Sequence, residues 1–541
     1  MSRRIRKLLV ANRGEIAVRV FRTCRELGIE TVAVAEPADT GSLHTRSAGE
    51  TVAIASYLDA SEYVRAARES GAEAVHPGYG FLSESAELAE AVLGAGLVWI
   101  GPPPAALRAG GDKLAAKRIA REAGVPVVEE GEPDALGFPL LVKAAAGGGG
   151  RGMRVVRSAG ELDAALEAAR REAGAAFGDD TVFCERYVER ARHVEVQLLA
   201  DRDGVFALGE RDCSIQRRHQ KVLEESPSPA VDEALRAELS DAAVRFATAI
   251  GYLGAGTAEF MVAGREFFFL ELNARIQVEH PVTEAVTGRD LVADQISIAQ
   301  GGRVERGGLS PGTQGHAVEV RLYAEDPKTF LPQTGRIERL RLPGGIRVDQ
   351  GVEEGDEVGT RYDPMIAKLI AHGSSRDESI AKLSEALAET EVRGVVTNLP
   401  FLRWLVGHRV FRAGDTTTDF LTRYPPLSPA PPRLPDPVWA TPFRLNLPSP
   451  SASAPPDLDD PSHAHAPGEG AGTIAAPMPG TVIGVNVAAG DTVAARDALV
   501  VIEAMKMEMP LTASRAGRIR AVHVAEVDTV ARGTVLVEME D

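Results

Sequence analysis

The chain has 541 residues, 44% of them apolar, and a formal net charge of −17. This length predicts about three or four globular units, and the acidic balance argues against broad binding to nucleic acid or to anionic membranes. Its three cysteines, Cys24, Cys184 and Cys213, lie far apart, which favours neither a disulfide framework nor a zinc site and indicates a reducing compartment. The apolar run Leu8 to Ala11 is too short for a signal peptide or membrane span, so we expect a cytoplasmic protein.

The N-terminal segment alternates strand and helix patterns. Leu8 to Ala11 predicts a buried strand, a helix follows from Gly14 to about Leu27, and Thr31 to Ala35 predicts the next strand. This βαβ order indicates an α/β sheet. The Gly- and Pro-rich stretch His76 to Glu84 follows a predicted strand, where open α/β sheets bind ligands. Taken alone, a plain turn is the alternative.

Four consecutive glycines at positions 147–150 lie between two predicted strands, one carrying Lys143 and one at Met153 to Val156. Such a run costs folding entropy that a plain hairpin would avoid. Its backbone N–H groups can close over phosphates, with the charge of Lys143 beside them; a flexible hairpin is the alternative. The sequence contains no Gly-Lys dipeptide, and hence no GxxxxGK[ST] phosphate loop, so ATP would need another fold.

Two later stretches concentrate polar chemistry. The first is a basic run, which taken alone is typical of a solvated face: Arg211, Arg217, Arg218, His219 and Lys221. The second is a set of polar residues with a period of two: Glu271, Asn273, Arg275, Gln277 and Glu279. An extended chain would put this second set on one face, whether in a site or on an amphipathic edge strand. Glu259, on the neighbouring predicted strand, can approach Glu271, and such oxygen ligands suit a Mg²⁺ ion that bridges ATP phosphates.

The C-terminal region repeats itself with a shift of about 37 residues, which matches Gly480 with Gly517 and residues 491–493 with residues 528–530. The repeat predicts two similar β halves in a small flattened barrel, joined by a hairpin that carries Lys506. Lys506 lies between two methionines in an exposed turn. We therefore interpret it as an attachment point for a prosthetic group, with a solvated surface lysine as the alternative.

These motifs carry a resemblance to a known family. Ala504-Met505-Lys506-Met507 resembles a biotinyl carrier domain, since a lipoyl domain would not be expected to carry Met on both sides of the lysine. Residues 11–17 and the stretch His76 to Glu84 resemble the N-terminal domain of biotin carboxylases, and the glycine-rich region resembles the ATP-grasp fold. Over about residues 5–424 and 473–541, the chain is similar to alpha subunits of biotin-dependent acyl-CoA carboxylases of the acetyl-/propionyl-CoA type.

The resemblance implies a multidomain chain of α/β and α+β class. The expected parts are an N-terminal α/β domain at 1–111, an ATP-grasp domain at 112–311, a C-terminal biotin carboxylase domain at 312–424 and an all-β carrier domain at 473–541. Fourteen of the 34 prolines lie between Pro425 and Pro467, so residues 425–472 are expected to form an extended linker. A short docking element is expected from Pro437 to Asn446.

The resemblance also implies a site and its cofactors: ATP, Mg²⁺ or Mn²⁺, and biotin on Lys506. The implied ATP contacts are Lys113, Lys143, Gly147, Gly148, Gly149, Gly150, Glu185, Arg186, Val188, His193, Gln216 and His219. The implied metal ligands are Glu259, Glu271 and Asn273. Bicarbonate would be held by Arg275, Gln277 and Val278.

By the same resemblance, Glu279 would remove the proton of bicarbonate and Lys221 would offset charge on the phosphoryl side. Arg321 would stabilise the enolate form of the biotin ureido oxygen. Position 186 is Arg where Lys is expected, and Ala274 replaces an expected Thr or Pro. These departures leave the implied chemistry unchanged, because a hinge contact made by backbone atoms does not depend on the side chain.

The implied partners are bicarbonate, a biotin protein ligase and a separate carboxyltransferase beta subunit, within a homo-oligomer that belongs to a larger hetero-oligomer. Two alternatives stay open at this point. The same half-reaction could serve a methylcrotonyl-CoA, pyruvate, urea or other carboxylase. A chain of another class would be a non-catalytic biotin or lipoyl carrier module with a degenerate ATP site.

Overall fold

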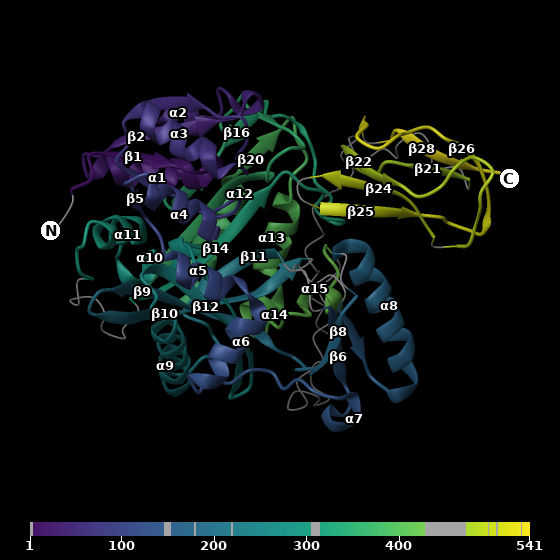
Figure 1. Cartoon of the computed structure of the whole chain (residues 1–541), viewed down its shortest axis with the longest axis horizontal. Coiled ribbons are helices and arrows are strands. Elements are labelled where there is room, and N and C mark those ends of the chain that lie inside the picture. The colour runs from purple at the N-terminus through teal and green to yellow at the C-terminus, as the bar shows by residue number, and fades with distance from the viewer. Residues whose placement is uncertain are drawn as a thin grey trace, which may run out of the picture.

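The computed structural model describes residues 4–144, 153–177, 180–217, 220–304, 314–427, 472–495, 497–504, 507–531 and 533–540 (Figure 1). Lys506, His219, the four glycines at 147–150 and the expected linker with its docking element lie outside these residues, apart from the linker ends. In the described part of the chain, none of the helices combines the length and apolar character needed to cross a membrane.

The N-terminal part is a parallel five-stranded sheet in the order β3-β2-β1-β4-β5. Its strands are β1 (Lys7–Val10), β2 (Glu30–Ala35), β3 (Glu50–Ala53), β4 (Ala74–His76) and β5 (Val98–Trp99). Its helical elements are α1 (Gly14–Glu26), η1 (Pro37–Asp39), α2 (Leu43–Ser47), α3 (Ala60–Ser70), α4 (Ala86–Gly94) and α5 (Pro104–Gly111). The predicted βαβ opening is confirmed.

The loop after β4 is fixed to the first strand–helix turn. The Asn12 side chain donates hydrogen bonds to the carbonyls of Pro77 (2.9 Å) and Tyr79 (2.7 Å). Gly78, with φ +64°, lies so close that a Cβ there would be 3.0 Å from the Asn12 amide, so a larger residue would displace this contact. The contacts with Asn12 therefore fix the loop from His76 to Glu84 at the carboxyl end of the sheet.

An antiparallel eight-stranded sheet forms the centre of the molecule, in the order β13-β12-β9-β10-β11-β14-β19-β17. Its strands are β9 (Arg192–Asp201), β10 (Gly204–Arg217), β11 (Gln220–Ser226), β12 (Gly254–Ala263), β13 (Glu266–Asn273), β14 (His316–Tyr323), β17 (Arg347–Gln350) and β19 (Met365–Gly373). The associated helices are α9 (Glu233–Ala249), α10 (His280–Thr287) and α11 (Leu291–Ala299). Because β11 pairs with β14, this sheet combines strands from both sides of the domain boundary that the sequence suggests between residues 311 and 312.

A smaller lobe carries the strands that flank the glycine-rich region. A three-stranded sheet, β7-β6-β8, packs against α8. Its elements are α7 (Pro133–Leu136), β6 (Leu140–Ala144), β7 (Arg154–Val156), α8 (Ala159–Phe177) and β8 (Val182–Arg186). The helix that precedes them, α6 (Lys113–Glu122), packs against α5, α9 and β13 instead. The two strands predicted on either side of the glycines are confirmed.

The third part packs helices against the far end of the central sheet. Its helices are α12 (Arg376–Glu389), α13 (Leu399–Gly407), α14 (Arg409–Arg412) and α15 (Phe420–Arg423), and its short strands are β15 (Gly335–Arg336), β16 (Arg339–Arg341), β18 (Glu357–Val358) and β20 (Glu391–Arg393). Phe330, Leu383, Leu402 and Phe411 belong to one buried core here, together with residues of β11, β14 and β19. This core fixes the third part to the sheet that carries the polar site.

The C-terminal part is two four-stranded sheets, β21-β28-β26-β23 and β25-β24-β22-β27, with a core of their own. The strands are β21 (Thr473–Ala475), β22 (Gly480–Val485), β23 (Thr492–Val493), β24 (Ala498–Ala504), β25 (Met507–Thr512), β26 (Gly517–Val522), β27 (Thr529–Val530) and β28 (Val535–Met539). The two halves contain equivalent backbone hydrogen bonds. The Gly490 N–H donates to the Ile519 carbonyl (2.8 Å), and the Val527 N–H donates to the Val482 carbonyl (2.7 Å). The predicted repeat and hairpin are confirmed, since Ala504 pairs with Met507 across the tip.

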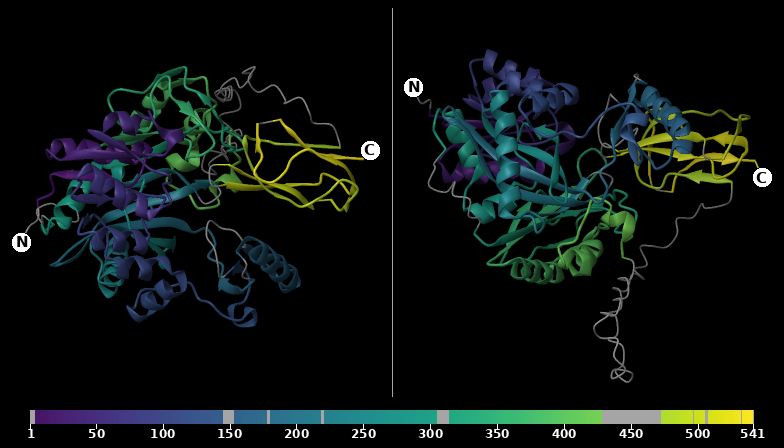
Figure 2. Two further views of the ribbon diagram at one scale, coloured as in Figure 1. Left: turned by 45° about the horizontal axis from the view of Figure 1, so that its top comes forward. Right: turned by 90° about the horizontal axis from the view of Figure 1, so that it is seen from below.

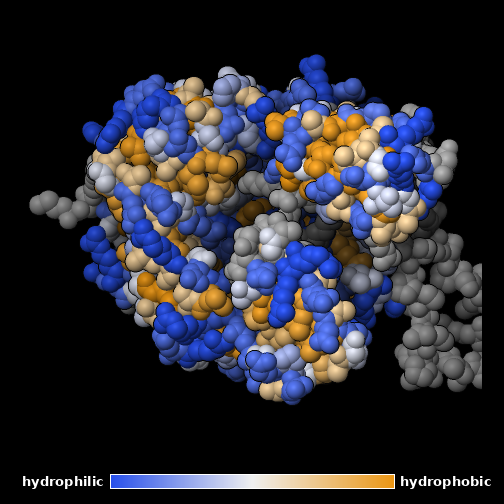
Figure 3. All heavy atoms as spheres, turned by 45° about the vertical axis from the view of Figure 1, so that its right-hand side comes forward, coloured by the Kyte–Doolittle hydropathy of each residue, from blue (hydrophilic) through white to orange (hydrophobic). Residues whose placement is uncertain are grey.

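The two further views in Figure 2 show this C-terminal part as a lobe of its own beside the rest of the molecule. In Figure 3 the surface between the lobes is hollowed, and apolar and polar side chains are mixed on each lobe. The polar residues predicted to act together lie on the central sheet and in the turn that follows β13.

Candidate active site

Lys221, on β11, is the centre of a buried charge cluster. Its ammonium group lies 2.5 Å from Glu195, 2.6 Å from Glu259 and 2.7 Å from Glu279. Burial alone would lower the pKa of Lys221, but the three carboxylates raise it well above its usual range. Lys221 therefore carries its positive charge at neutral pH, at a point where three strands and a turn converge.

Glu279 lies in the turn that precedes α10 and is fully buried. Its carboxylate accepts hydrogen bonds from Lys221 (2.7 Å) and from Arg321 of β14 (2.9 Å). Burial alone would raise the pKa of Glu279, but Lys221, Arg321 and Arg211 hold it well below its usual range. The group is thus ionised, which a proton acceptor requires.

Glu259 and Glu271 face each other on β12 and β13, as the sequence predicts. The Glu259 carboxylate also accepts hydrogen bonds from Asn273 (2.9 Å) and Gln277 (3.2 Å), and His193 Nε2 lies 2.9 Å away. Burial and the charge of Glu259 raise the pKa of Glu271. A divalent cation held between these oxygens would relieve that repulsion, so the donor set fits Mg²⁺.

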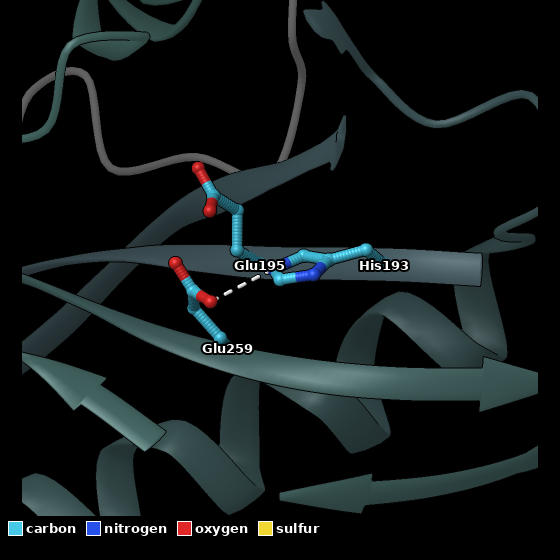
Figure 4. A group of neighbouring side chains, drawn as sticks. All are labelled: His193, Glu195 and Glu259. Atoms are coloured by element: carbon cyan, nitrogen blue, oxygen red, sulfur yellow. Dashed lines mark ion pairs between the residues drawn. The ribbon is translucent and has the colours of Figure 1, made fainter. Parts of the chain in front are cut away.

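Figure 4 shows a second group of possible ligands on the same face: His193, Glu195 and Glu259. One donor atom from each lies within 4.8 Å of the others. His193 and Glu195 are two residues apart on β9 and therefore project to one side. Glu195 is absent from the predicted site. Its period-two spacing from His193 is the signal that could have found it.

The prediction of one extended chain from Glu271 to Glu279 is wrong, because β13 ends at Asn273 and the following residues turn into α10. The polar side chains still converge, because they form hydrogen bonds with one another. Arg275 donates to Gln277 (2.9 Å) and to Asn273 (3.0 Å).

The loop after β4 reaches the same turn through Glu84. Its carboxylate accepts hydrogen bonds from the Ala274 backbone (2.9 Å) and from Arg275 (3.2 Å). The N-terminal part therefore helps to position Arg275, for which the family resemblance implies a contact with bicarbonate.

Arg321 is buried beside two carboxylates. Besides Glu279, it contacts Glu224 of β11 at 2.5 Å. Burial raises the pKa of Glu224 to about 7, and the charge of Arg321 opposes that rise. Glu224 is a further residue that the predicted site omits. The guanidinium of Arg321 is thus placed to support the charge of Glu279, in addition to any contact with a bound molecule.

Val278 and Lys368 join the turn to β19. Lys368 is fully buried, donates to the Val278 carbonyl (2.8 Å) and lies 3.0 Å from Glu15. Glu15 and Tyr79 line a cleft of about 660 Å³ between the N-terminal sheet and residues 351–365. The contacts from Glu15 to Lys368 and from Lys368 to Val278 connect this cleft to the turn that carries Glu279.

The residues predicted to contact ATP fall into three places. The ammonium group of Lys143 lies 2.6 Å from the Glu185 carboxylate. Arg186 follows Glu185 on β8, and its guanidinium carbon lies 4.9 Å from the centre of the Phe268 ring. Val188 is half-buried just beyond β8. Lys113 begins α6 and lies 3.9 Å from Glu271.

His193 belongs to the carboxylate cluster described above. Gln216 lies on β10 and donates to the Cys213 carbonyl (2.9 Å). The basic run at 211–221 is not a solvated face among its described residues, because Arg211 and Arg217 are buried in the β10–β11 hairpin.

Four family models match successive parts of the chain. "Biotin carboxylase, N-terminal domain" matches residues 4–107 and "Carbamoyl-phosphate synthase L chain, ATP binding domain" matches residues 112–306. "Biotin carboxylase C-terminal domain" matches residues 319–423 and "Biotin-requiring enzyme" matches residues 472–539.

Similar proteins agree with these matches. The biotin-dependent acyl-coenzyme A carboxylase alpha3 subunit of Mycobacterium leprae is 41% identical in an alignment that covers 100% of this chain and 99% of that subunit. The chain belongs to the biotin carboxylase family. The biotin carboxylase of Halalkalibacterium halodurans is 47% identical over 441 residues, or 77% of this chain and 98% of that protein.

The methylcrotonoyl-CoA carboxylase subunit alpha of Arabidopsis thaliana, described as mitochondrial, is 46% identical over 445 residues. The match covers 78% of this chain but only 61% of that relative's length. Among solved structures, the biotin carboxylase domain of Hydrogenobacter thermophilus 2-oxoglutarate carboxylase, in complex with MgADP, ADP and bicarbonate, has a TM-score of 0.74. It is 41% identical and covers 78% of this chain and 98% of that domain.

The predicted fold class and cofactors are confirmed by these matches. The fold is that of a multidomain α/β biotin carboxylase with an ATP-grasp domain and an all-β biotinyl domain. Its cofactors are covalent biotin and ATP with Mg²⁺.

Proposed function

We propose that this chain loads a carboxyl group onto biotin attached to Lys506 and delivers it to a separate carboxyltransferase subunit that acts on acetyl-CoA or propionyl-CoA. The observation that carries the proposal is the end-to-end similarity to an acyl-coenzyme A carboxylase alpha subunit, which includes the carrier domain. Bicarbonate, a biotin protein ligase and further copies of the chain are the other proposed partners, and the cytoplasm is the proposed compartment.

A methylcrotonyl-CoA acceptor is the second candidate. It is supported by 46% identity to a methylcrotonoyl-CoA carboxylase subunit alpha, over the carboxylase part. The two candidates share the ATP-dependent half-reaction and differ in the transferase. They also share the proposed division of the chain into 1–111, 112–311, 312–424, 425–472 and 473–541.

The charge cluster is suited to bringing bicarbonate against ATP. At an effective dielectric constant near 20, two unit charges about 4 Å apart repel by roughly 4 kcal/mol, so several cations must offset the phosphates. Lys221 and Arg275 are the proposed protein cations here, and Glu259, Glu271 and Asn273 would hold the Mg²⁺ that neutralises phosphate charge.

We propose Glu279 as the group that takes the bicarbonate proton, with Gln277 and the Val278 backbone beside the anion. Of the positive charges that lower the pKa of Glu279, Lys221 and Arg321 contribute most. An incoming anion competes for those same charges. The basicity of Glu279 therefore rises when the charges are shared, which is the point at which a proton must be accepted. The oxygen freed of its proton attacks the terminal phosphorus of ATP, and ADP leaves.

Lys506→Arg tests the attachment site. Arginine keeps the positive charge but cannot form the amide to biotin, so intact-mass measurement should show one biotin per wild-type chain and none per variant. Free-biotin carboxylation by the variant should stay near the wild-type rate, because the charge cluster lies in another part of the molecule. Streptavidin binding that persists in the variant would contradict the assignment.

Arg321→Ala separates two roles for this arginine. If Arg321 acts on the biotin ureido oxygen, as the family resemblance implies, bicarbonate-dependent ATP cleavage should fall less than biotin carboxylation. The 2.9 Å contact with Glu279 supports a second role, which would lower both rates equally. Arg376→Ala is the matched control, since Arg376 forms a buried ion pair with Glu225 outside the cluster. Equal losses in Arg321→Ala would exclude a biotin-specific role.

A further inference from the structure

A short loop at residues 326–332, between β14 and β15, connects two hydrophobic cores. Phe330 is 8% exposed and lies in the core of the third part of the molecule. Its ring packs edge-on against the ring of Phe401, with 4.9 Å between the two ring centres. The next residue, Leu331, packs against the core of the carrier domain instead. Two neighbouring side chains thus join the carboxylase to its own carrier.

The loop has a fixed shape. Asp326 caps it, because its carboxylate accepts hydrogen bonds from the backbone of Lys328 (3.0 Å) and of Thr329 (2.8 Å). Two backbone bonds close it, Phe330 N–H to Asp326 and Asp326 N–H to Leu331, both 2.9 Å. Phe330 has φ +57°, a left-handed conformation that an aromatic residue adopts only where its surroundings hold it. This conformation turns the chain between the two cores.

The same loop is tied to the nucleotide side of the site. Arg217, at the end of β10, forms a buried ion pair with Glu325, and its guanidinium carbon lies 5.1 Å from the Tyr323 ring centre and 5.8 Å from that of Phe330. Gln216, a proposed ATP contact, precedes Arg217 on the strand. These contacts fix the position of the loop relative to β10. The contact between the loop and the carrier domain is therefore fixed relative to the same strand.

The carrier presents its hairpin end to the carboxylase. In Figure 1 the end at which β24 leads towards β25 points to the body of the molecule, and its far end points away. We propose that the loop at residues 326–332 is the docking element for the chain's own carrier domain during biotin carboxylation, with Leu331 as the apolar anchor. This inference rests on the proposed function and names the surface that the carrier uses.

Leu331→Ser in the full-length, biotinylated chain tests the docking element. Labelled bicarbonate and ATP should label the carrier of the variant at least about tenfold more slowly, because serine removes the apolar contact between the two cores. Free-biotin carboxylation and bicarbonate-dependent ATP cleavage should stay within about twofold of wild type, since free biotin needs no docking. Carrier labelling at the wild-type rate would overturn the inference.

Two further variants control the experiment. Leu58→Ser removes a leucine that is 67% exposed in the N-terminal part and should leave carrier labelling unchanged. Leu331→Met keeps an apolar side chain and should restore most of the rate; a loss as large as that of Leu331→Ser would contradict the anchor. Free-biotin carboxylation by the wild-type chain tests the proposed function separately. If the wild-type chain cannot carboxylate free biotin, the proposed function is wrong, and the docking inference, which rests on it, is wrong as well.

A mixing experiment identifies whose carrier docks. Lys506→Arg protein, which keeps Leu331 and cannot carry biotin, is mixed with Leu331→Ser protein, which carries biotin. Slow labelling in the mixture, equal to that of Leu331→Ser alone, is expected for docking within one chain. Labelling restored to the wild-type rate would overturn the proposal in favour of docking on a second copy.

Discussion

Glu279→Gln should give a folded protein that binds ATP but cleaves it in response to bicarbonate about 100-fold more slowly, or worse. The amide oxygen can still accept a hydrogen bond from Lys221 or Arg321, both of which lie within 2.9 Å of the carboxylate, so the geometry is retained. The amide cannot take up a proton at neutral pH. ADP release with and without bicarbonate measures the loss, and titration with a non-hydrolysable ATP analogue measures binding.

Glu225→Gln is the matched control for that experiment. Glu225 is a buried carboxylate on β11, like Glu224 beside it, but its partners are Arg376 and His316 and lie outside the cluster. The Glu225→Gln variant should cleave ATP at a rate close to that of the wild type. Near-normal turnover in Glu279→Gln would remove Glu279 from the proposed role, whereas equal losses in both variants would point to a general effect of removing a buried charge.

The lowered pKa of Glu279 also predicts a pH dependence of stability. A carboxylate whose pKa is lower in the folded than in the unfolded state stabilises the fold above the unfolded value, near about 4.3 for Glu. That contribution is lost as the pH falls through the folded pKa. The unfolding temperature of the wild type should thus fall more steeply below about pH 4 than that of Glu279→Gln, in which the group no longer titrates.

Much of this molecule follows from local sequence patterns. The βαβ opening, the strands around the glycine run and the hairpin between Ala504 and Met507 depend on residues close together in the chain, where periodicity and turn residues act directly. The pairing of Glu259 with Glu271 is also short-range, since a two-strand hairpin places them opposite each other.

The parts that local patterns do not reveal depend on long-range packing. Arg321 meets Glu279 because β14 pairs with β11, and Lys368 reaches the Val278 carbonyl from 90 residues away. Glu195 belongs to a strand whose neighbours are largely apolar, and only the position of β9 in the sheet brings it to Lys221. The period-two pattern beyond Asn273 is misleading, because it reflects a turn whose side chains bond to one another.

The purified chain, given ATP, Mg²⁺ and bicarbonate, should load its own carrier but carboxylate no acyl-CoA until a carboxyltransferase subunit is added. A transferase must bind a CoA thioester and stabilise its enolate, which requires an oxyanion hole in a further binding site. The proposed function assigns the four matched regions to ATP-dependent carboxylation and to the carrier. Adding transferase subunits of the acetyl-, propionyl- and methylcrotonyl-CoA types in turn should restore activity with the acceptor that the chain serves.

The proposed linker at residues 425–472 makes this delivery physically possible. About 45 residues treated as a flexible coil span roughly 35 to 40 Å root-mean-square, and proline-rich stiffness would extend that distance. Deleting most of residues 425–467 should therefore cut coupled acyl-CoA carboxylation strongly, while free-biotin carboxylation stays near the wild-type rate. Replacement of the same residues by a Gly/Ser segment of equal length is the matched control and should retain coupled activity if reach alone matters. Carboxylation of acetyl-CoA or propionyl-CoA by the isolated chain would show that a transferase site lies within a region assigned here to ATP-dependent chemistry.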